Sequence, residues 1–489
     1  MNNLANNILR NAAETPDRIA TQSGTTSLTY TQLDAQVRKA AYVLRDRGVS
    51  DGSVVGIALR DGQQTVVAML SIWLLGGTCG LIDFRTPGND KKSLSEAHNF
   101  AVLLEDRNQP DDGYPGLSLS QWSKELAAAP MAQISPPADA GIAFLSFTSG
   151  TTGTPASVEL SHDAVIFRWA ILTEVLTGDF NQRYLSAAPL SFGGSYPYIV
   201  NTLLLGGSVI FFPPLFRPRD LAEAFEKYRI TGCSLVPTIL RDLLGYLREI
   251  GKSLATPDTP LRLVTHGAAI QPAELKNIQE LLTPNVFQVY GTHPAGCLAS
   301  LDLRKEPTKI DTVGRPLRGV EVEIVDPHGK PLPAMTVGEI RIKSRGCSTS
   351  LKGRNKEAGS DYIIGDWYYG GDLGLIDEDG YLKLVGRTTD VIIRSGINVY
   401  PQEVEAALSD FPGVRQAAAV GYPDERTNEE IAVFAVADPN VDVEELRRHC
   451  NARLAPDKRP KRILIIPEMP LNANGKIAKQ KLLELLANA

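Results

Sequence analysis

The chain has 489 residues, of which 43% are hydrophobic and 22% charged, with a formal net charge of −6 at pH 7. This length is more than one hydrophobic core supports, and it predicts two to four domains in a globular protein. The small negative charge argues against non-specific nucleic-acid binding, which requires clustered cationic surface. Five scattered cysteines without C-x-x-C spacing predict unpaired thiols in a reducing compartment, so a cytoplasmic location is expected.

The N-terminus has neither a cationic region nor an apolar run, so no signal peptide is expected. Residues 62–82 carry no charge and are long enough to suggest a membrane span. Gly76 and Gly77 interrupt this stretch, and Asp61 and Asp83 bound it closely. We interpret it as a buried helix over 65–75 followed by a strand at 79–82.

Strand and helix patterns alternate over the first 290 residues. Apolar spacing predicts a helix over 31–47 that ends at Gly48. Residues 106–140, rich in Pro, Asp, Ser and Ala, are expected to form a surface excursion. The remaining strands are expected at 54–59, 183–188, 208–212, 232–236, 261–265 and 286–290, and the helices at 163–176, 221–228 and 238–250. This alternation predicts an α/β fold with largely parallel sheets and right-handed crossovers.

From about residue 300 the alternation of strands and helices gives way to a different pattern. Runs at 320–325, 339–342, 373–376 and 381–385 are separated by turn residues and predict hairpins, with a polar loop over 344–361. After residue 387 we expect a strand at 391–393, a helix that begins at Pro401, strands at 414–420 and 431–435, and a helix over 442–454. A β-rich section is therefore followed by a small α+β domain.

A glycine-rich loop follows the apolar run 142–145. It contains the hydroxyl residues Thr148, Ser149, Thr151 and Thr152 around Gly150 and Gly153. Glycine tolerates the positive φ angles that turn several backbone amides toward one anion, so the loop can hold a phosphate. It lacks the spacing of a Walker loop. The alternative is an ordinary surface loop.

Seven motifs in order along the chain resemble those of the adenylate-forming superfamily of acyl-CoA synthetases, peptide-synthetase adenylation domains and luciferases. Each motif alone is weak, but their order is specific and covers essentially the whole chain. The motifs are Thr148–Pro155, Val236–Thr238, Gln288–Gly291, Tyr369–Gly374, Gly386–Asp390, Ser395–Glu405 and Pro470–Lys476.

The resemblance implies activation of a carboxylic acid by ATP as an acyl adenylate, with release of pyrophosphate and transfer of the acyl group to a thiol. ATP, Mg²⁺ and coenzyme A are the expected cofactors, although the protein ligand of Mg²⁺ stays open. The implied architecture is a large N-terminal AMP-binding domain over 1–388, with its β-rich subdomain at about 300–388. A small mobile C-terminal domain over 389–489 would rotate about a hinge at Thr389 and carry the catalytic Lys476.

The resemblance also assigns roles to individual residues. Lys476 would bridge the substrate carboxylate and the α-phosphate, and Gly396 would pass near the pantetheine thiol. Without this context Tyr290 would be interpreted as core, and Asp372 and Lys476 as solvated charges. The expected ATP and AMP site comprises Thr148, Ser149, Gly150, Thr151, Thr152, Gly153, Gly267, Ala268, Ala269, Tyr290, Gly291, Thr292, Asp372 and Arg387.

The sequence departs from the family pattern on the phosphate and metal side. The loop lacks its usual lysine, since Ala156 and Ser157 follow Pro155, and Pro294 replaces the glutamate that helps to hold Mg²⁺. The hinge is Thr389 instead of Asp or Lys, and Phe192 replaces a frequent histidine. One interpretation is an active enzyme whose Mg²⁺ is held by phosphates and water. The other is a nucleotide- or adenylate-binding member with weak catalysis; retention of the catalytic lysine favours activity.

The expected acyl pocket comprises Phe192, Gly193, Gly194 and Tyr196. No aspartate stands in 191–196 to hold an amine, so we expect an acid without an α-amine and an acyl- or aroyl-CoA ligase. An enzyme that loads a carrier-protein pantetheine or forms an amide is the alternative. Neither nucleic acid nor a membrane span is expected, and a homodimer is left open.

Overall fold

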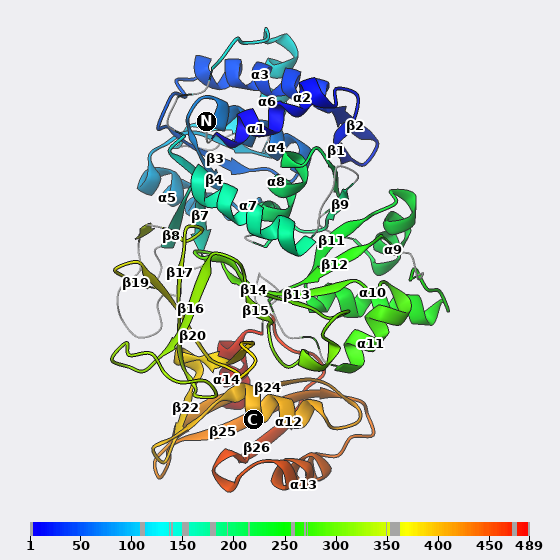
Figure 1. Ribbon diagram of the computed structural model, residues 1–489, viewed down its shortest axis with the longest axis vertical. Helices are drawn as coiled ribbons and strands as arrows, with labels where there is room; N and C mark the ends of the chain where they lie inside the picture. The colour runs from blue at the N-terminus through cyan, green and yellow to red at the C-terminus, as the bar shows by residue number, and fades with distance from the viewer. Residues whose placement is uncertain are drawn as a thin grey trace. The chain divides into compact units, whose positions relative to one another are not determined.

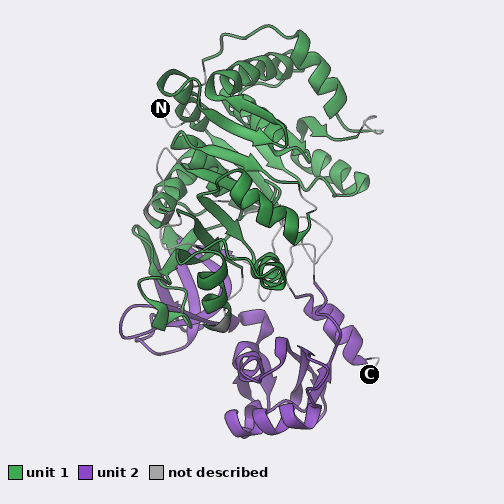
Figure 2. Ribbon diagram, turned by 90° about the vertical axis from the view of Figure 1, so that its right-hand side faces the viewer, with its two compact units in different colours: residues 1–321, 343–354 green, residues 322–342, 355–489 purple. Residues whose placement is uncertain are grey.

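The computed structural model, shown in Figure 1, describes residues 3–107, 113–135, 137, 140–148, 156–176, 182–192, 194–213, 216–255, 260–267, 270, 272–348, 350–352, 362–471 and 477–487. Two compact units form: the first comprises Met1–Glu321 with Lys343–Arg354, and the second Val322–Ile342 with Asn355–Ala489 (Figure 2). The β-rich section after residue 322 thus groups mainly with the C-terminal segment. The domain boundary at 388/389 stays a prediction.

The largest sheet of the first unit is parallel in its centre, from β13 to β1, and antiparallel at both edges. Its parallel strands alternate with helices along the chain, which confirms the predicted α/β organisation. In order across the sheet the strands are β15 (Arg315–Pro316), β14 (Gly296–Asp302), β13 (Val286–Thr292), β12 (Arg262–Thr265), β11 (Gly232–Leu235), β9 (Arg183–Ser186), β10 (Ser208–Phe211), β1 (Ile19–Ser23) and β2 (Thr26–Thr29).

A second sheet of this unit is parallel from β7 to β6 and antiparallel at the edge formed by β8 and β18. Its strands are β18 (Ser350–Lys352), β8 (Ala156–Ser161), β7 (Ile142–Thr148), β4 (Thr78–Leu81), β3 (Val54–Ala58), β5 (Phe100–Glu105) and β6 (Gly116–Ser118). Mixed sheets of this kind, with parallel strands inside, were expected from the sequence.

Helices cover both sheets of the first unit. Helix α4 contacts β1 of one sheet and β3 and β4 of the other, while α9, α10 and α11 lie side by side near β11 and β12 (Figure 1). The helices are α1 (Leu4–Leu9), α2 (Asn11–Glu14), α3 (Tyr30–Asp46), α4 (Gly62–Leu74), α5 (Gly88–His98), α6 (Leu119–Ala128), α7 (His162–Leu176), α8 (Tyr196–Leu204), α9 (Pro218–Lys227), α10 (Pro237–Glu249), α11 (Pro272–Leu281) and the 3-10 turn η1 (Pro307–Lys309).

The uncharged stretch 62–82 is a buried helix followed by a strand, as predicted. Asp61 accepts backbone hydrogen bonds from Gln63 and Gln64 and so caps α4. Trp73, fully buried on this helix, donates its indole N–H to the carbonyl of Ala143 at 2.8 Å. In the part of the chain that is described, no helix has both the length and the apolar character to cross a membrane.

The second unit contains two smaller sheets and confirms the β-rich section and the α+β segment. The first sheet has β16 (Val320–Val325), β17 (Gly338–Ser344), β20 (Trp367–Ile376), β19 (Tyr362–Ile364) and β21 (Leu382–Arg387). The second has β23 (Ile397–Val399), β22 (Ile392–Arg394), β25 (Asn428–Ala437), β24 (Val414–Asp424) and β26 (Arg462–Ile465). The helices are η2 (Thr388–Asp390), α12 (Pro401–Ser409), α13 (Val443–Arg453), η3 (Pro456–Lys458) and α14 (Lys479–Ala487).

Two expectations were wrong. Within 106–140, expected as a surface excursion, β6 and α6 form and bury Trp122 completely. Within 344–361, expected as a polar loop, β18 pairs with β8. Both elements are short and lie among loop-forming residues, so their hydrophobic pattern is weak. Tertiary packing decides their structure.

Candidate active site

A small pocket lies in the first unit where the parallel strands β9, β11 and β12 end. Ligands of open α/β sheets bind outside these carboxyl ends. The cavity has a volume of about 30 Å³, which leaves room for little more than water. Of the predicted acyl-pocket residues, Phe192 and Gly194 line it, and Gly193 lies outside the described residues. The lining residues are Tyr184, Ala187, Ala188, Phe192, Gly194, Ser195, Ser234, Val236, Ile239 and His266.

Four stacked rings, which we name the aromatic row, form one side of this region. The ring centroids of Phe192 and His266 are 5.9 Å apart, those of His266 and Tyr198 6.5 Å, and those of Tyr198 and Tyr184 5.8 Å. A Cβ atom at Gly194 would lie 2.5 Å from His266 Cε1 and 2.9 Å from Phe192 Cε1. Glycine at 194 is therefore required for His266 to enter the pocket.

Tyr196, the fourth predicted pocket residue, is 1% exposed and belongs to a buried cluster around Arg168. Arg168 on α7 donates to the Tyr196 hydroxyl at 3.0 Å and to the carbonyl of Gly346 at 2.8 Å. It also donates to the carbonyls of His293 at 3.2 Å and Pro294 at 2.7 Å. The guanidinium thus fixes the turn that follows β13.

This turn is where the sequence predicts the loss of a magnesium ligand. Pro294 offers no side-chain oxygen, and its carbonyl accepts a hydrogen bond from the cationic Arg168. Mg²⁺ is held in proteins by oxygen ligands, mainly carboxylates. Across the described ranges, no group of three or more His, Cys, Asp or Glu side chains could hold a metal ion. The residues present at this strand end therefore do not fit a protein-bound Mg²⁺.

The glycine-rich loop joins two antiparallel strands. Strand β7 ends at Thr148, which pairs with Ala156 at the start of β8. The loop residues Ser149 to Gly153 lie outside the described residues. A hairpin connection differs from a Walker loop, which leads from a strand into a helix, so the structure agrees with the absence of that spacing.

Further residues of the expected ATP and AMP site lie at the ends of β12 and β13. Tyr290 is 8% exposed on β13, and a Cβ atom on the next residue, Gly291, would lie 2.4 Å from the carbonyl of Gly296. Thr292 accepts a hydrogen bond from the Ala295 amide at 3.3 Å. Gly267 follows β12 with φ +88°, a conformation that favours glycine. Ala268 and Ala269 lie outside the described residues.

In the second unit, Asp372 and Arg387 face each other across an antiparallel hairpin. Asp372 on β20 is the direct register partner of Arg387 on β21, and Arg387 Nε lies 3.2 Å from Asp372 Oδ1. Arg387 also donates to the carbonyl of Gly370 at 2.7 Å, and Thr388 donates to that of Gly371 at 3.2 Å. Two residues of the expected ATP and AMP site are thus brought together.

The predicted hinge residue Thr389 lies in the 3-10 turn η2. Its hydroxyl donates to Asp390 at 3.1 Å, and Asp390 forms an ion pair of 2.7 Å with Lys479 at the start of α14. Lys476, the predicted catalytic lysine, lies outside the described residues. Leu471 and Ile477, which precede and follow the undescribed residues, form an antiparallel bridge.

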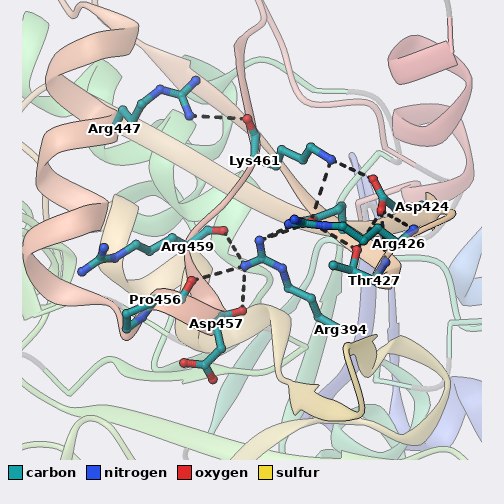
Figure 3. A network of polar contacts seen from close by, with 10 residues as sticks. Arg394, Asp424, Arg426, Thr427, Arg447, Pro456, Asp457, Arg459 and Lys461 are labelled. Atoms are coloured by element: carbon teal, nitrogen blue, oxygen red, sulfur yellow. Dashed lines mark hydrogen bonds and ion pairs between the residues drawn. The ribbon is translucent and has the colours of Figure 1, made fainter.

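The predicted pantetheine-side residue Gly396 lies at the tip of the hairpin formed by β22 and β23, with φ +80°. Figure 3 shows how Arg394, at the end of β22, is held. Its guanidinium donates to the carbonyls of Pro456, Asp457 and Arg459 at 2.9–3.3 Å, and it lies 2.9 Å from Glu430 Oε2. Because Glu430 is 1% exposed, this is a buried ion pair at the base of the hairpin.

Next to this pair, Lys461 and Asp424 extend the network (Figure 3). Lys461 Nζ lies 2.7 Å from Asp424 Oδ2, and the hydrogen bond holds the pKa of that carboxyl well below its usual range. Thr427 donates to Asp424 at 3.0 Å and to Glu430 at 3.2 Å. The hairpin that carries Gly396 is therefore anchored by several linked contacts.

Sequence reasoning missed His266, Ser234 and Tyr184. Each lies in or directly after a strand that was correctly predicted, at the carboxyl end of the parallel sheet. Their register across β9, β11 and β12 brings them together. Their positions at the ends of predicted parallel strands could have indicated them, because ligand sites of such sheets lie at these strand ends.

A pocket at the carboxyl ends of the parallel strands defines the class of protein: an α/β protein with a ligand site at its strand ends. The family described as AMP-binding enzyme matches residues 8–350, and the AMP-binding enzyme C-terminal domain matches residues 403–476. The chain therefore belongs to the family of AMP-binding enzymes, within the adenylate-forming superfamily.

Two characterised relatives match nearly the whole chain. The 2-succinylbenzoate–CoA ligase of Bacillus licheniformis is 28% identical over 97% of this chain and 99% of its own length. The feruloyl-CoA synthase of an Amycolatopsis species is 29% identical over 96% of both chains. The relatives are thus acid–thiol ligases, and the enzyme class expected from the sequence is confirmed.

Two solved structures share the fold. The o-succinylbenzoate CoA synthetase of Bacillus subtilis, solved with its acyl-adenylate intermediate, is 25% identical, with a TM-score of 0.85 over 98% of this chain and 97% of that one. It has also been solved with ATP and a magnesium ion. The amide bond synthetase of Marinactinospora thermotolerans is 26% identical, with a TM-score of 0.84 over 99% of both chains.

Proposed function

We propose that this enzyme is an aroyl- or acyl-CoA ligase that activates a carboxylic acid without an α-amine. The observation that carries this proposal is the strand-end pocket, whose described lining is aromatic, aliphatic or small and includes neither aspartate nor glutamate. An amino-acid substrate would bring a buried ammonium group that needs such a carboxylate. The names of the relatives, which act on aryl acids, support the same class.

In the first step, a carboxylate oxygen of the acid attacks the α-phosphorus of ATP, and the bond to pyrophosphate breaks. The hydroxyls and amides of Thr148, Ser149, Gly150, Thr151, Thr152 and Gly153 hold the β- and γ-phosphates. Lys476 neutralises the charge that develops between the carboxylate and the α-phosphate. Because two anions must meet, positioning and charge stabilisation supply most of the catalysis.

The residues that the motifs assign to the nucleoside are proposed to keep those roles. Tyr290, Gly291 and Thr292 lie beside the adenine together with Gly267, Ala268 and Ala269. Asp372 accepts hydrogen bonds from the ribose hydroxyls, since a carboxylate offers two acceptor oxygens, and Arg387 orients it. The pairing of Asp372 with Arg387 supports this role because it fixes the carboxylate before the nucleotide arrives.

In the second step, the thiol of coenzyme A attacks the acyl carbon. The thiol proton goes to water, and AMP leaves with the carboxylate oxygen that had attacked phosphorus. Gly396, at the tip of the anchored hairpin, passes beside the pantetheine arm. The segment 389–489 rotates about Thr389 between the two steps, a known class of domain motion.

Mg²⁺ enters with ATP, bound by phosphate oxygens and water, and supplies charge neutralisation when present. This fits its tendency to keep several waters and to bind through substrate phosphates.

The five cysteines, all within the described part of the chain, are unpaired, which supports a reducing compartment such as the cytoplasm. A homodimer stays an open proposal.

An amide-forming enzyme is the second candidate, because the similarity to an amide bond synthetase is as high as that to a CoA ligase structure. Both candidates share the adenylation step and differ in the acceptor. A carrier-protein pantetheine would replace coenzyme A in a further variant.

The test is to incubate the protein with ATP, Mg²⁺ and a panel of acids, either without an acceptor, with coenzyme A or with an amine. We expect acid-dependent pyrophosphate release, and an acyl-CoA product by mass spectrometry when coenzyme A is present. Adenylate formation followed by amide but not thioester would support the second candidate. If none of the acids supports pyrophosphate release at any Mg²⁺ concentration, the protein binds nucleotide with weak catalysis.

A further inference from the structure

The aromatic row of the strand-end pocket also carries hydroxyl groups, which lie beside Ser234. Ser234 on β11 and Tyr184 on β9 line the cavity, and Ser234 lies next to the hydroxyls of both Tyr184 and Tyr198. Burial raises the pKa of both phenols well above the usual range, so both remain uncharged hydrogen-bonding groups at neutral pH. The inner end of the pocket is therefore polar and neutral.

The lining also lacks permanent positive charge. Among the described residues that line the cavity, none is lysine or arginine. A substrate carboxylate placed there would lose its hydration without gaining a cationic partner, which is costly in a buried site. A hydroxyl or carbonyl group would instead exchange hydrogen bonds with Ser234 and Tyr184.

The aromatic row sets the shape of the pocket. His266 is stacked between Phe192 and Tyr198, and its edge reaches the space beside Gly194. A flat ring can slide along such faces with favourable stacking, whereas a branched aliphatic group cannot. Because the cavity has a volume of only about 30 Å³, lining side chains such as His266 or Phe192 must move aside when an aryl acid binds.

We propose that this pocket selects a flat aromatic acid with an uncharged hydrogen-bonding substituent at its far end, and that His266 is the residue that limits the size of the ring. The proposal rests on the proposed function, since it names the substrate class of the same site. It separates two chemistries that the relatives' names leave open. An aryl monoacid with a hydroxyl group fits, and an aryl acid with a second carboxylate does not.

The first experiment compares three acids with one skeleton: cinnamate, 4-hydroxycinnamate and 4-carboxycinnamate, with octanoate as the aliphatic reference. The readout is kcat/KM for acid-dependent pyrophosphate release. We expect 4-hydroxycinnamate to exceed cinnamate about tenfold, the effect of one buried hydrogen bond. We expect 4-carboxycinnamate to fall roughly a hundredfold below cinnamate, whichever of its carboxylates reacts.

Two variants assign the effect to residues. Ser234→Ala should reduce the preference for 4-hydroxycinnamate over cinnamate to about onefold. His266→Ala should admit 4-phenylcinnamate, and His266→Phe, which keeps a flat ring, should continue to exclude it. Thermal unfolding midpoints of all variants confirm that the fold is intact.

The outcomes separate this inference from the function on which it rests. Release with octanoate or 4-carboxycinnamate in preference to the other acids would overturn the inference and leave the ligase function standing. Equal rates with cinnamate and 4-hydroxycinnamate would overturn it as well. If none of the acids, octanoate included, supports pyrophosphate release, the proposed function and the inference are both overturned.

Discussion

Asp372 and Arg387 show how a single cross-strand pair can prepare a ligand site. Directly opposed residues of an antiparallel hairpin hold their side chains close without further help. Arg387 is half-exposed and bonds to the Gly370 carbonyl as well, so it has a fixed orientation and an edge that faces solvent. We infer that this pairing positions the Asp372 carboxylate for a ribose hydroxyl.

Asp372→Asn is expected to weaken ATP binding. The amide retains the shape of the side chain but loses the charge-assisted acceptor, so KM for ATP should rise roughly ten- to hundredfold with a smaller change in kcat. Steady-state kinetics at saturating acid measure this change. Glu378→Gln, on the exposed turn of the same hairpin, is the matched control and should be neutral. An unchanged KM in Asp372→Asn would remove the residue from the nucleotide site.

Lys476→Ala is expected to stop adenylation. The ammonium group is the charge proposed to meet the developing negative charge, and such contributions amount to roughly a hundredfold or more in kcat. Pyrophosphate release and the thermal midpoint are measured together, and the midpoint should not change. Lys481→Ala, on the exposed face of α14, serves as the control. Full activity in Lys476→Ala would refute the assigned role.

At the scale of elements, the β22–β23 hairpin depends on one buried ion pair. Arg394 binds three carbonyls around η3 and the buried Glu430, so it ties the hairpin to β25 and to the segment before β26. Lysine could supply the charge but not this planar set of donors. The position of Gly396 therefore follows from Arg394.

Arg394→Gln is expected to affect the second half-reaction more than the first. A displaced hairpin should lower thioester formation roughly tenfold, because misplacement of a positioning element costs that much or more, while acid-dependent pyrophosphate exchange stays near its original rate. Single-turnover transfer from preformed adenylate to coenzyme A measures the difference. Arg426→Gln, with an exposed side chain, is the control. Equal loss in both half-reactions would indicate a general structural role.

Another element-scale contact joins the first residues of the chain to α7. His162, 1% exposed at the start of α7, accepts a hydrogen bond from the Leu4 amide at 3.2 Å and packs against Trp73. Burial lowers the pKa of His162 from 6.5 to about 4. Its ring is therefore neutral in the folded protein throughout the range in which an unfolded chain would become protonated.

This shift predicts a loss of stability in acid. Between pH 6.5 and 4 the unfolded chain binds a proton that the folded protein does not. The free energy of unfolding therefore decreases as the pH is lowered, by up to about 3 kcal/mol. Above pH 6.5 the group contributes no pH dependence. In His162→Gln this part of the acid slope should disappear, as followed by urea unfolding with tryptophan fluorescence. His328→Gln, on an exposed turn, should keep the original slope.

For the whole molecule, the helices and strands that could be predicted from the sequence are those with a strong apolar periodicity. The helix predicted over 31–47 is α3, and the strands at 232–236 and 261–265 are β11 and β12, because these segments have clear apolar patterns. Strand β18 could not be predicted, since its pairing with β8 is a long-range contact with no local signal. The burial of Trp122 on α6 likewise depends on packing.

The residues of the candidate site also differ in whether the sequence predicts them. Motif order indicated Asp372 and Arg387, and the hairpin register brings them together as β20 and β21 pair. His266 carries no motif and gains its position from the stacking of Phe192 and Tyr198 on its two faces. Residues that fill a pocket are chosen by shape, which a single sequence does not encode locally.

The most direct test of the central claim is isotope transfer from the acid to AMP. The acid is prepared with both carboxylate oxygens as oxygen-18, and the AMP formed in the presence of ATP and coenzyme A is analysed by mass spectrometry. If the carboxylate attacks the α-phosphorus, each AMP carries one oxygen-18 atom and each thioester retains the other. AMP without oxygen-18, accompanied by thioester product, would contradict an acyl-adenylate mechanism.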